Sequence, residues 1–543
     1  MPRKYHSAVA IVFGILFLLM VTVPYYWSFQ SMGETYHFGG FLLNPIDGNS
    51  YLAKMYQGWL GNWRFHLPYT AEPGEGGYLF IFYLGLGQIA RFLGWSLIFT
   101  FHSWRILGAG LMAFSLWRFF GRVLPTERAQ WFAYVLALFG SGMGWIGAMF
   151  GFFSADFWVA EGYPFLAGYA NPHFPLGIAI MILILTPQKD TLVSKWVGRN
   201  WFQAFLIICS SIILGILLPF GSVVVILILA GVGLWDLSGF LAKKGQLRNL
   251  WSEVFALLRA SEGFRKLIWV VLGGLPVLIY EYWITNKDPI FSVWNEQNLT
   301  LAPSPLDLLL SFSPLILLSL LGIRWVWRNR ETEMRVIVVW AVLGLILLYF
   351  PWNLQRRFIL GYMIPLAGLA SIALDRIFFR HRGTALILLC LTFLLFIPTN
   401  LMIVAGGLQA VNAQEPGLGL SSPEMKGLDW LKSNSPQDGL VLASPEMGLF
   451  IPAYTGRRVL YGHPFETVNA AEMVALVENL LLNLDNPVQD LELYDISYVF
   501  FGPRERELTK KNLEPDFLPA FESGDVQIFD VEDILSEYAD EEP

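Results

Sequence analysis

An acidic residue in a short polar segment is the first candidate for chemistry. Asp47 lies in the segment 44–51, which runs Asn-Pro-Ile-Asp-Gly-Asn-Ser-Tyr and follows the first hydrophobic stretch of the chain. A carboxylate can take the proton of an attacking hydroxyl group if it lies within hydrogen-bond reach. Asp is also a common turn residue that accepts hydrogen bonds from its own backbone. The segment alone therefore leaves a catalytic base and a turn-forming residue both open.

Further polar candidates follow between 152 and 173. Asp156 and Glu161 are carboxylates that could assist a base, position an acceptor or share a divalent cation through their oxygens. Solvated loop acids are the plain alternative. No Asp-x-Asp pair occurs in the segments expected outside the membrane, so the spacing does not support a metal site, and any cofactor stays unknown. His173 precedes the next apolar stretch, where it is either a site residue or a helix-end packing residue.

Two adjacent arginines are the second strong signal. Arg356 and Arg357 lie in the segment 350–358, which we expect at the outer face of a membrane. A guanidinium group matches the geometry of a phosphate group and can bind it through two hydrogen bonds. Arginines that reach toward lipid headgroups are the alternative. Arg105 is a weaker candidate for the same lipid-phosphate role, and Glu281 is a candidate partner for an arginine.

These residues must be positioned by membrane-spanning helices. The 543-residue chain is 55% hydrophobic and only 15% charged, whereas soluble domains contain about 25% charged residues. A membrane-spanning helix needs about 20 apolar residues. We expect eleven spans, near 8–28, 97–118, 130–151, 174–187, 201–219, 222–241, 267–285, 307–326, 335–350, 358–375 and 384–404.

The distribution of basic residues predicts the orientation of these spans. Lys and Arg gather in five connecting loops, within 118–128, 189–199, 243–266, 324–335 and 376–382. Cytoplasmic loops carry such an excess, so we expect these loops and the N-terminus inside the cell and the C-terminus outside, in a plasma (inner) membrane. The eleven spans give this orientation only if the apolar stretch 77–94 does not cross the membrane. We therefore expect 77–94 to form an in-plane or re-entrant helix. Twelve spans are the alternative.

The remaining parts follow from this topology. Long external segments are expected at 29–96, 152–173 and 286–306, with an interfacial helix at 51–60 in the first. The composition changes near residue 415, so we expect a transmembrane domain over 1–414 and a soluble extracytoplasmic domain over 415–543. In the second domain, strands at 440–443, 458–461, 497–501 and a hairpin within 517–529 alternate with helices at 421–431 and 469–484. This alternation predicts a small α/β domain.

Several function classes are not indicated. The chain has no P-loop, no glycine-rich nucleotide-binding fingerprint and no Ser-His-Asp signature, and it shows no basic face suited to nucleic acid.

The arrangement resembles the GT-C superfamily of integral-membrane glycosyltransferases, which includes protein O-mannosyltransferases, lipid A aminoarabinose transferases and oligosaccharyltransferase catalytic subunits. The resemblance depends on the many spans and on a long first external loop with an early acid, Asp47. The segments 294–298, 355–358 and 443–448 are similar to patterns in a bacterial branch of that superfamily. They run Trp-Asn-Glu-Gln-Asn, Gln-Arg-Arg-Phe and Ala-Ser-Pro-Glu-Met-Gly.

The resemblance implies an enzyme that uses a polyprenyl-phosphate-linked sugar donor and transfers a hexosyl or pentosyl group to a lipid, glycan or protein acceptor at the outer face. Asp47 matches the catalytic acid of the family's first loop, and Asp156 is the nearest match to the acid of the second loop. The family commonly has paired acids in the first loop, whereas no carboxylate adjoins Asp47. Two alternatives remain, a transporter or flippase of lipid-linked oligosaccharides and a non-catalytic scaffold of the cell envelope. If Asp47 and the paired arginines share one cavity, a transferase is favoured.

Overall fold

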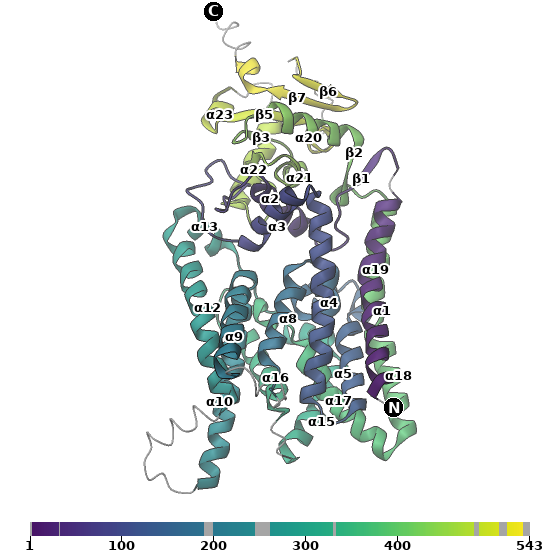
Figure 1. Cartoon of the computed structure of the whole chain (residues 1–543). Coiled ribbons are helices and arrows are strands. Elements are labelled where there is room, and N and C mark those ends of the chain that lie inside the picture. The colour runs from purple at the N-terminus through teal and green to yellow at the C-terminus, as the bar shows by residue number, and fades with distance from the viewer. Residues whose placement is uncertain are drawn as a thin grey trace, which may run out of the picture. The chain divides into compact units, whose positions relative to one another are not determined.

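The computed structural model follows most of the chain (Figure 1). It describes residues 3–31, 33–188, 199–244, 261–329, 333–482, 488–509 and 518–535. The predicted basic loops at 189–199 and 243–266 lie largely outside these residues.

The described part of the chain is mostly helical and belongs to a multi-pass membrane protein. Within the described ranges, seven helical segments are long and apolar enough to cross a membrane. They are Ala8–Gln30 in α1 (Arg3–Gln30), α4 (Leu97–Val123), Glu127–Ala148 (α5, Glu127–Phe139, with α6, Gly144–Ala148), Pro219–Phe240 in α10 (Pro219–Lys244), α12 (Glu262–Lys287), Gln355–Arg380 (η4, Gln355–Ile359, with α17, Met363–Arg380) and Arg382–Asn412 (α18, Arg382–Phe396, with α19, Pro398–Asn412).

Shorter helices account for the remaining predicted spans. α14 (Pro305–Phe312) and α15 (Leu315–Asn329) form a pair bent by 82° that passes the same test as one broken span. Apolar helices of less than spanning length occupy the other predicted positions: α8 (His173–Leu185), α9 (Arg199–Leu217) and α16 (Arg335–Leu348). Each of the eleven predicted spans thus coincides with an apolar helix, whereas the count of eleven crossings stays a prediction.

The stretch 77–94 forms only a short helix. α3 (Ile81–Leu93) has 13 residues, which corresponds to about 20 Å at 1.5 Å per residue, less than a hydrocarbon core of about 30 Å. α8 has the same number of residues, so length alone does not separate the two helices, and the in-plane or re-entrant helix at 77–94 stays a prediction.

The chain divides into two compact units. Unit 1 comprises Met1–Pro24, Ser103–Tyr280 and Thr300–Gly406, and unit 2 comprises Tyr25–His102, Glu281–Leu299 and Gly407–Pro543. Unit 2 therefore joins two predicted external segments to the C-terminal residues. The predicted domain boundary at 414/415 stays a prediction.

Two glycines allow close packing in the first part of unit 2. α2 (Pro45–Trp59) lies against α3. A Cβ atom on Gly58 would lie 2.0 Å from the carbonyl oxygen of Leu84, and one on Gly87 would lie 1.9 Å from that of Met55. Both clashes are with backbone atoms, so only glycine permits this approach of the two helices.

The C-terminal part of unit 2 contains the predicted α/β fold. Its five-stranded sheet has the order β4-β3-β5-β7-β6, with β4, β3 and β5 parallel and β7 and β6 antiparallel. The strands are β3 (Leu440–Leu442), β4 (Arg458–Val459), β5 (Ile496–Phe501), β6 (Phe521–Ser523) and β7 (Val526–Asp530). A separate pair, β1 (Tyr36–Phe38) and β2 (Gly419–Ser421), joins the first external segment to the start of this fold within unit 2.

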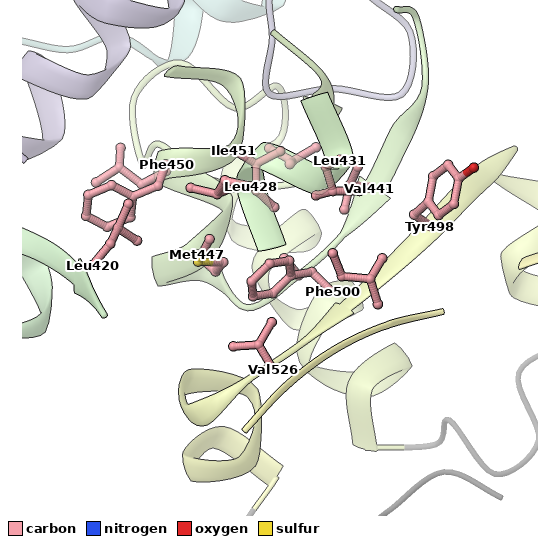
Figure 2. Packing of buried hydrophobic residues seen from close by; sticks show 14 of the residues in the cluster. Leu420, Leu428, Leu431, Val441, Met447, Phe450, Ile451, Tyr498, Phe500 and Val526 are labelled. Atoms are coloured by element: carbon pink, nitrogen blue, oxygen red, sulfur yellow. The ribbon is translucent and has the colours of Figure 1, made fainter. Parts of the chain in front are cut away.

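Alternating side chains give the sheet two apolar faces. Val441 and Phe500 face α20 (Ser422–Asn434) and α21 (Pro445–Thr455), where Met447 completes the core in Figure 2. Val499 and Phe501 belong to the other core, which α22 (Ala470–Leu482) closes. Successive residues of a strand point to opposite faces, so these buried runs require helices on both sides. The remaining helices of unit 2 are α13 (Pro289–Gln297), α23 (Val488–Leu493) and α24 (Pro503–Thr509).

Candidate active site

Asp47 lies in the first turn of a helix. The predicted interfacial helix at 51–60 begins earlier than expected, because Pro45 occupies the first helical position and Asn44 precedes it in the left-handed conformation with φ 51°. Proline is favoured at that position because its missing N–H group needs no partner there. A carboxylate in the first turn also interacts favourably with the helix dipole. The Asp47 side chain is 44% exposed, so it remains open to solvent.

A buried histidine contacts this carboxylate. Nε2 of His463 lies 3.4 Å from Oδ1 of Asp47, and the histidine side chain is only 2% exposed. On the other side of the ring, the backbone N–H groups of Phe465 and Glu466 donate to Nδ1, both at 3.1 Å. Because Nδ1 accepts two hydrogen bonds, the neutral ring carries its proton on Nε2 and donates it to Asp47.

A buried ion pair lies two helical turns farther along α2, at Lys54. Nζ of Lys54 donates to both oxygens of the Glu466 carboxylate, at 2.7 and 2.8 Å, and Oγ of Ser50 donates to the same carboxylate at 2.6 Å. The lysine side chain is fully buried, and its ammonium group lies 4.5 Å from the ring centre of Phe80. Such a cation–π contact stabilises an ammonium group that has lost its water.

Burial and pairing oppose each other in this ion pair. Burial alone would raise the pKa of Glu466, but the charge and hydrogen bond of Lys54 hold that pKa below its ordinary value. Burial lowers the pKa of Lys54, against the opposing attraction of Glu466 and Asp47. The nearby carboxylates also act on Tyr69, whose pKa is raised well above its ordinary value by burial first and by the charges of Glu466 and Asp47 second.

Sequence reasoning missed most of this cluster. Asp47, Ser50 and Lys54 are spaced by three and four residues, which places them on one face of a helix. That spacing was the available signal for Ser50 and Lys54. No comparable pattern marks His463 or Glu466, which are 416 and 412 residues from their partners Asp47 and Lys54.

Unit 1 contains a second cluster, in which the paired arginines meet a predicted acid. The Glu161 carboxylate lies 3.7 Å from Nε of Arg356 and 3.4 Å from Nη1 of Arg357, and it is 5% exposed. The Arg356 guanidinium group also lies 4.7 Å from the ring centre of Trp158. Both distances to the carboxylate exceed the 2.7–2.9 Å of a strong charge-assisted hydrogen bond. The arginines are 22% and 29% exposed, so both guanidinium groups remain partly accessible beside this carboxylate.

Asp156 is placed differently from Glu161. Its side chain is fully buried, and its oxygens accept hydrogen bonds from the backbone N–H groups of Gly142 and Gly144 and from the hydroxyl of Ser154. Burial raises the pKa of Asp156, and these hydrogen bonds oppose that rise. The carboxylate is therefore surrounded by the chain's own donors, an arrangement that holds the loop between α5 and α7 (Pro164–Ala170).

The other predicted site residues lie apart from these contacts. Arg105 is fully buried, and its Nη1 donates to the carbonyl oxygens of Val21 and Gly168 at 2.8 Å, which ties α4 to α1 and α7. His173 begins α8 and packs against Phe174, with ring centres 4.1 Å apart. Glu281 lies near the end of α12, and its side chain forms no ion pair with any residue that the structure describes.

Among the residues that the structure describes, no group of three or more His, Cys, Asp or Glu side chains could hold a metal ion.

Solved structures share this architecture. The Archaeoglobus fulgidus oligosaccharyltransferase AglB, in complex with an inhibitory peptide and a dolichol-phosphate, is similar with a TM-score of 0.55 and 13% identity, over 92% of this chain and 69% of that one. ArnT from Cupriavidus metallidurans, bound to undecaprenyl phosphate, is similar with a TM-score of 0.51 and 13% identity, over 95% and 97% of the two chains. The chain has the GT-C fold. No protein-family model and no curated protein sequence matches it.

The GT-C fold confirms the predicted fold class, a polytopic helical membrane protein with a small C-terminal α/β fold. The similarity to ArnT covers nearly the whole of both chains.

Proposed function

We propose that this protein is a membrane glycosyltransferase that moves a sugar from a polyprenyl-phosphate-linked donor to an acceptor at the outer face of the membrane. The acceptor is a lipid, a glycan or a protein, and the transferred group is a hexosyl or pentosyl unit. In this proposal the N-terminus lies in the cytoplasm, the C-terminal residues lie outside, and the membrane is the plasma (inner) membrane.

The half-exposed carboxylate of Asp47 carries the proposal. A buried histidine contacts it. The fold is shared with enzymes whose structures were solved in complex with lipid phosphates. In the proposed reaction the acceptor oxygen attacks the anomeric carbon, and the bond from that carbon to the donor's phosphate oxygen breaks. Asp47 takes the acceptor's proton. A single displacement of this kind inverts the anomeric configuration.

Arg356 and Arg357 are the proposed ligands of the phosphate group. Negative charge develops on the departing phosphate, and fixed cationic donors stabilise charge that develops in a transition state. Before the lipid binds, the Glu161 carboxylate balances the positive charge of these two arginines. Asp156 is assigned an indirect role, holding the loop that carries Glu161, because its buried carboxylate is surrounded by the chain's own donors. Arg105 is assigned to packing, because its buried guanidinium group donates to carbonyl oxygens of the chain itself.

Binding of the lipid phosphate tests the proposal without knowledge of the sugar. Purified full-length protein in nanodiscs is titrated with a short polyprenyl phosphate while thermal unfolding is followed. A ligand that binds only the native state stabilises it by about 2.7 kcal/mol at 100 times its Kd. We expect this stabilisation in the wild type and in Arg324→Ala/Arg328→Ala, whose arginines are exposed on α15, and its loss in Arg356→Ala/Arg357→Ala.

Two results would contradict the proposal. If the lipid phosphate does not stabilise the wild type, the protein does not bind the proposed donor. If Arg356→Ala/Arg357→Ala is still stabilised, the phosphate group binds at another site. A transporter or flippase would bind the lipid through the same arginines but would transfer no sugar. A non-catalytic scaffold would do neither.

A further inference from the structure

The contact between His463 and Asp47 brings together two distant parts of unit 2. Asp47 belongs to the first external segment, whereas His463 follows strand β4 of the C-terminal fold. The C-terminal fold therefore supplies a side chain to the carboxylate that carries the proposed chemistry.

The histidine is fixed by the loop from which it projects. Its carbonyl oxygen accepts the N–H groups of Glu466 and Thr467, at 3.3 and 2.9 Å. The N–H groups of Gly462 and His463 donate to the hydroxyl oxygen of Thr467, at 3.4 and 3.3 Å. Gln297 holds the next turn, because its side-chain oxygen accepts the N–H of Asn469 at 3.1 Å. A loop held at so many points leaves the imidazole ring little freedom.

The same loop is fastened to the helix that carries Asp47. Glu466 is bound by Lys54 and Ser50, which lie on the same face of α2 as Asp47. The ion pair thus fixes the separation between α2 and the loop, and with it the separation between the carboxylate and the imidazole. A catalytic constellation needs supporting groups of this kind, because small misplacements of a reacting group lower the rate.

We propose that His463 is a positioning residue, which donates its Nε2 proton to Asp47 and so fixes the direction in which the carboxylate faces the acceptor. The inference rests on the proposed transferase function. His463 itself does not reach substrate, because only 2% of its side chain is exposed. Its effect passes through Asp47, so its loss reduces the turnover number rather than the affinity for the donor.

Two substitutions separate positioning from loop stability. The amide nitrogen of Gln can take the place of Nε2, so His463→Gln keeps a donor to Asp47 but loses the acceptor for the backbone N–H groups. The amide oxygen of Asn can take the place of Nδ1, so His463→Asn keeps the loop acceptor but loses the contact with Asp47. The two variants therefore remove opposite halves of the histidine's hydrogen bonding.

The test measures sugar transfer and thermal unfolding for both variants of the full chain in nanodiscs. We expect kcat to fall about 10-fold or more in His463→Asn, with KM for the donor within about 2-fold of the wild type. In His463→Gln we expect kcat within about 3-fold of the wild type and a lower Tm. If His463→Asn keeps the wild-type kcat, or if His463→Gln loses activity while His463→Asn retains it, the positioning role is overturned.

Wild-type protein and Asp47→Asn in the same assay separate this failure from failure of the proposed function. If the wild type transfers sugar and Asp47→Asn does not, the proposed function holds and the His463 variants decide the inference alone. If the wild type transfers no sugar, or if Asp47→Asn remains active, the proposed function fails and the positioning role falls with it.

Discussion

Removal of Lys54 probes the buried network behind Asp47. In Lys54→Met the ammonium group is replaced by an apolar side chain of similar length, and the Glu466 carboxylate loses both of its hydrogen bonds from Nζ. The lysine side chain is fully buried and the carboxylate is 12% exposed, so water cannot replace the lost partner without rearrangement. The substitution therefore leaves a buried charge that lacks its counter-ion.

The size of the effect follows from this geometry. Removing one partner of a buried ion pair costs about 3–5 kcal/mol. Ser50 still donates to Glu466, which places the expected loss at the lower end, at about 3 kcal/mol. For a domain of about 150–250 residues, each kcal/mol lowers Tm by about 2–4 °C, so the expected decrease is about 6–12 °C.

A double-mutant cycle distinguishes the ion pair from simple loss of packing. Lys54→Met/Glu466→Gln removes both charges, so we expect it to be more stable than the sum of the two single losses by about 2 kcal/mol. The assay is thermal unfolding in nanodiscs at one fixed scan rate, since membrane proteins often unfold irreversibly. The ion-pair account would be refuted if the stability losses of the two single variants add up in the double variant. It would also be refuted if Lys54→Met lowers Tm by less than about 2 °C.

The same pair gives a pH dependence of known sign. Because the pKa of Glu466 is lower in the folded protein than its ordinary value, its stabilising contribution is complete above the unfolded pKa of about 4.3 and is lost as the pH falls through the lower, folded pKa. We therefore expect the Tm difference between wild type and Lys54→Met to shrink below about pH 4. A difference that grows in acid would contradict the assignment.

Two other substitutions test separate parts of the structure. Glu161→Gln removes the negative charge beside Arg356 and Arg357, so polyprenyl phosphate should bind about 5-fold more tightly, in keeping with a charge interaction of about 1 kcal/mol at a separation of about 4 Å in water. Unchanged affinity with reduced transfer would instead give Glu161 a direct part in the reaction. Gly87→Ala should destabilise the α2–α3 contact by about 1–3 kcal/mol, because its Cβ would lie 1.9 Å from a backbone oxygen. Gly85→Ala is the matched control, since its Cβ would come no closer than 4.0 Å to Trp63, and equal stability of the two variants would contradict the packing argument.

Local sequence patterns predicted much of the architecture. The apolar stretches coincide with helices, and the strands at 440–442 and 496–501 and the hairpin that ends at Asp530 lie where alternation and turn residues indicated them. These features depend on neighbours in sequence, so composition and periodicity reveal them. The start of α2 at Pro45 was missed because the Pro-Ile-Asp-Gly segment also suits a turn.

The candidate site was only partly predictable, because its contacts join distant segments. Asp47 and the paired arginines were recognisable from residue type and expected topology. The burial of Asp156 was not, because its donors are backbone N–H groups of glycines that sequence patterns do not mark. His463 and Glu466 were missed for a similar reason, since the packing of the C-terminal fold against α2 within unit 2 decides their role.

Sugar transfer by wild-type protein and Asp47→Asn tests the central claim most directly. A panel of polyprenyl-phosphate-linked sugars is offered with a membrane lipid extract as acceptor, and Asp429→Asn, which alters an exposed acid on α20, is the control. The account predicts transfer by the wild type and the control, and a loss of about 100-fold or more in Asp47→Asn with unchanged Tm. Transfer by Asp47→Asn at the wild-type rate would contradict the account.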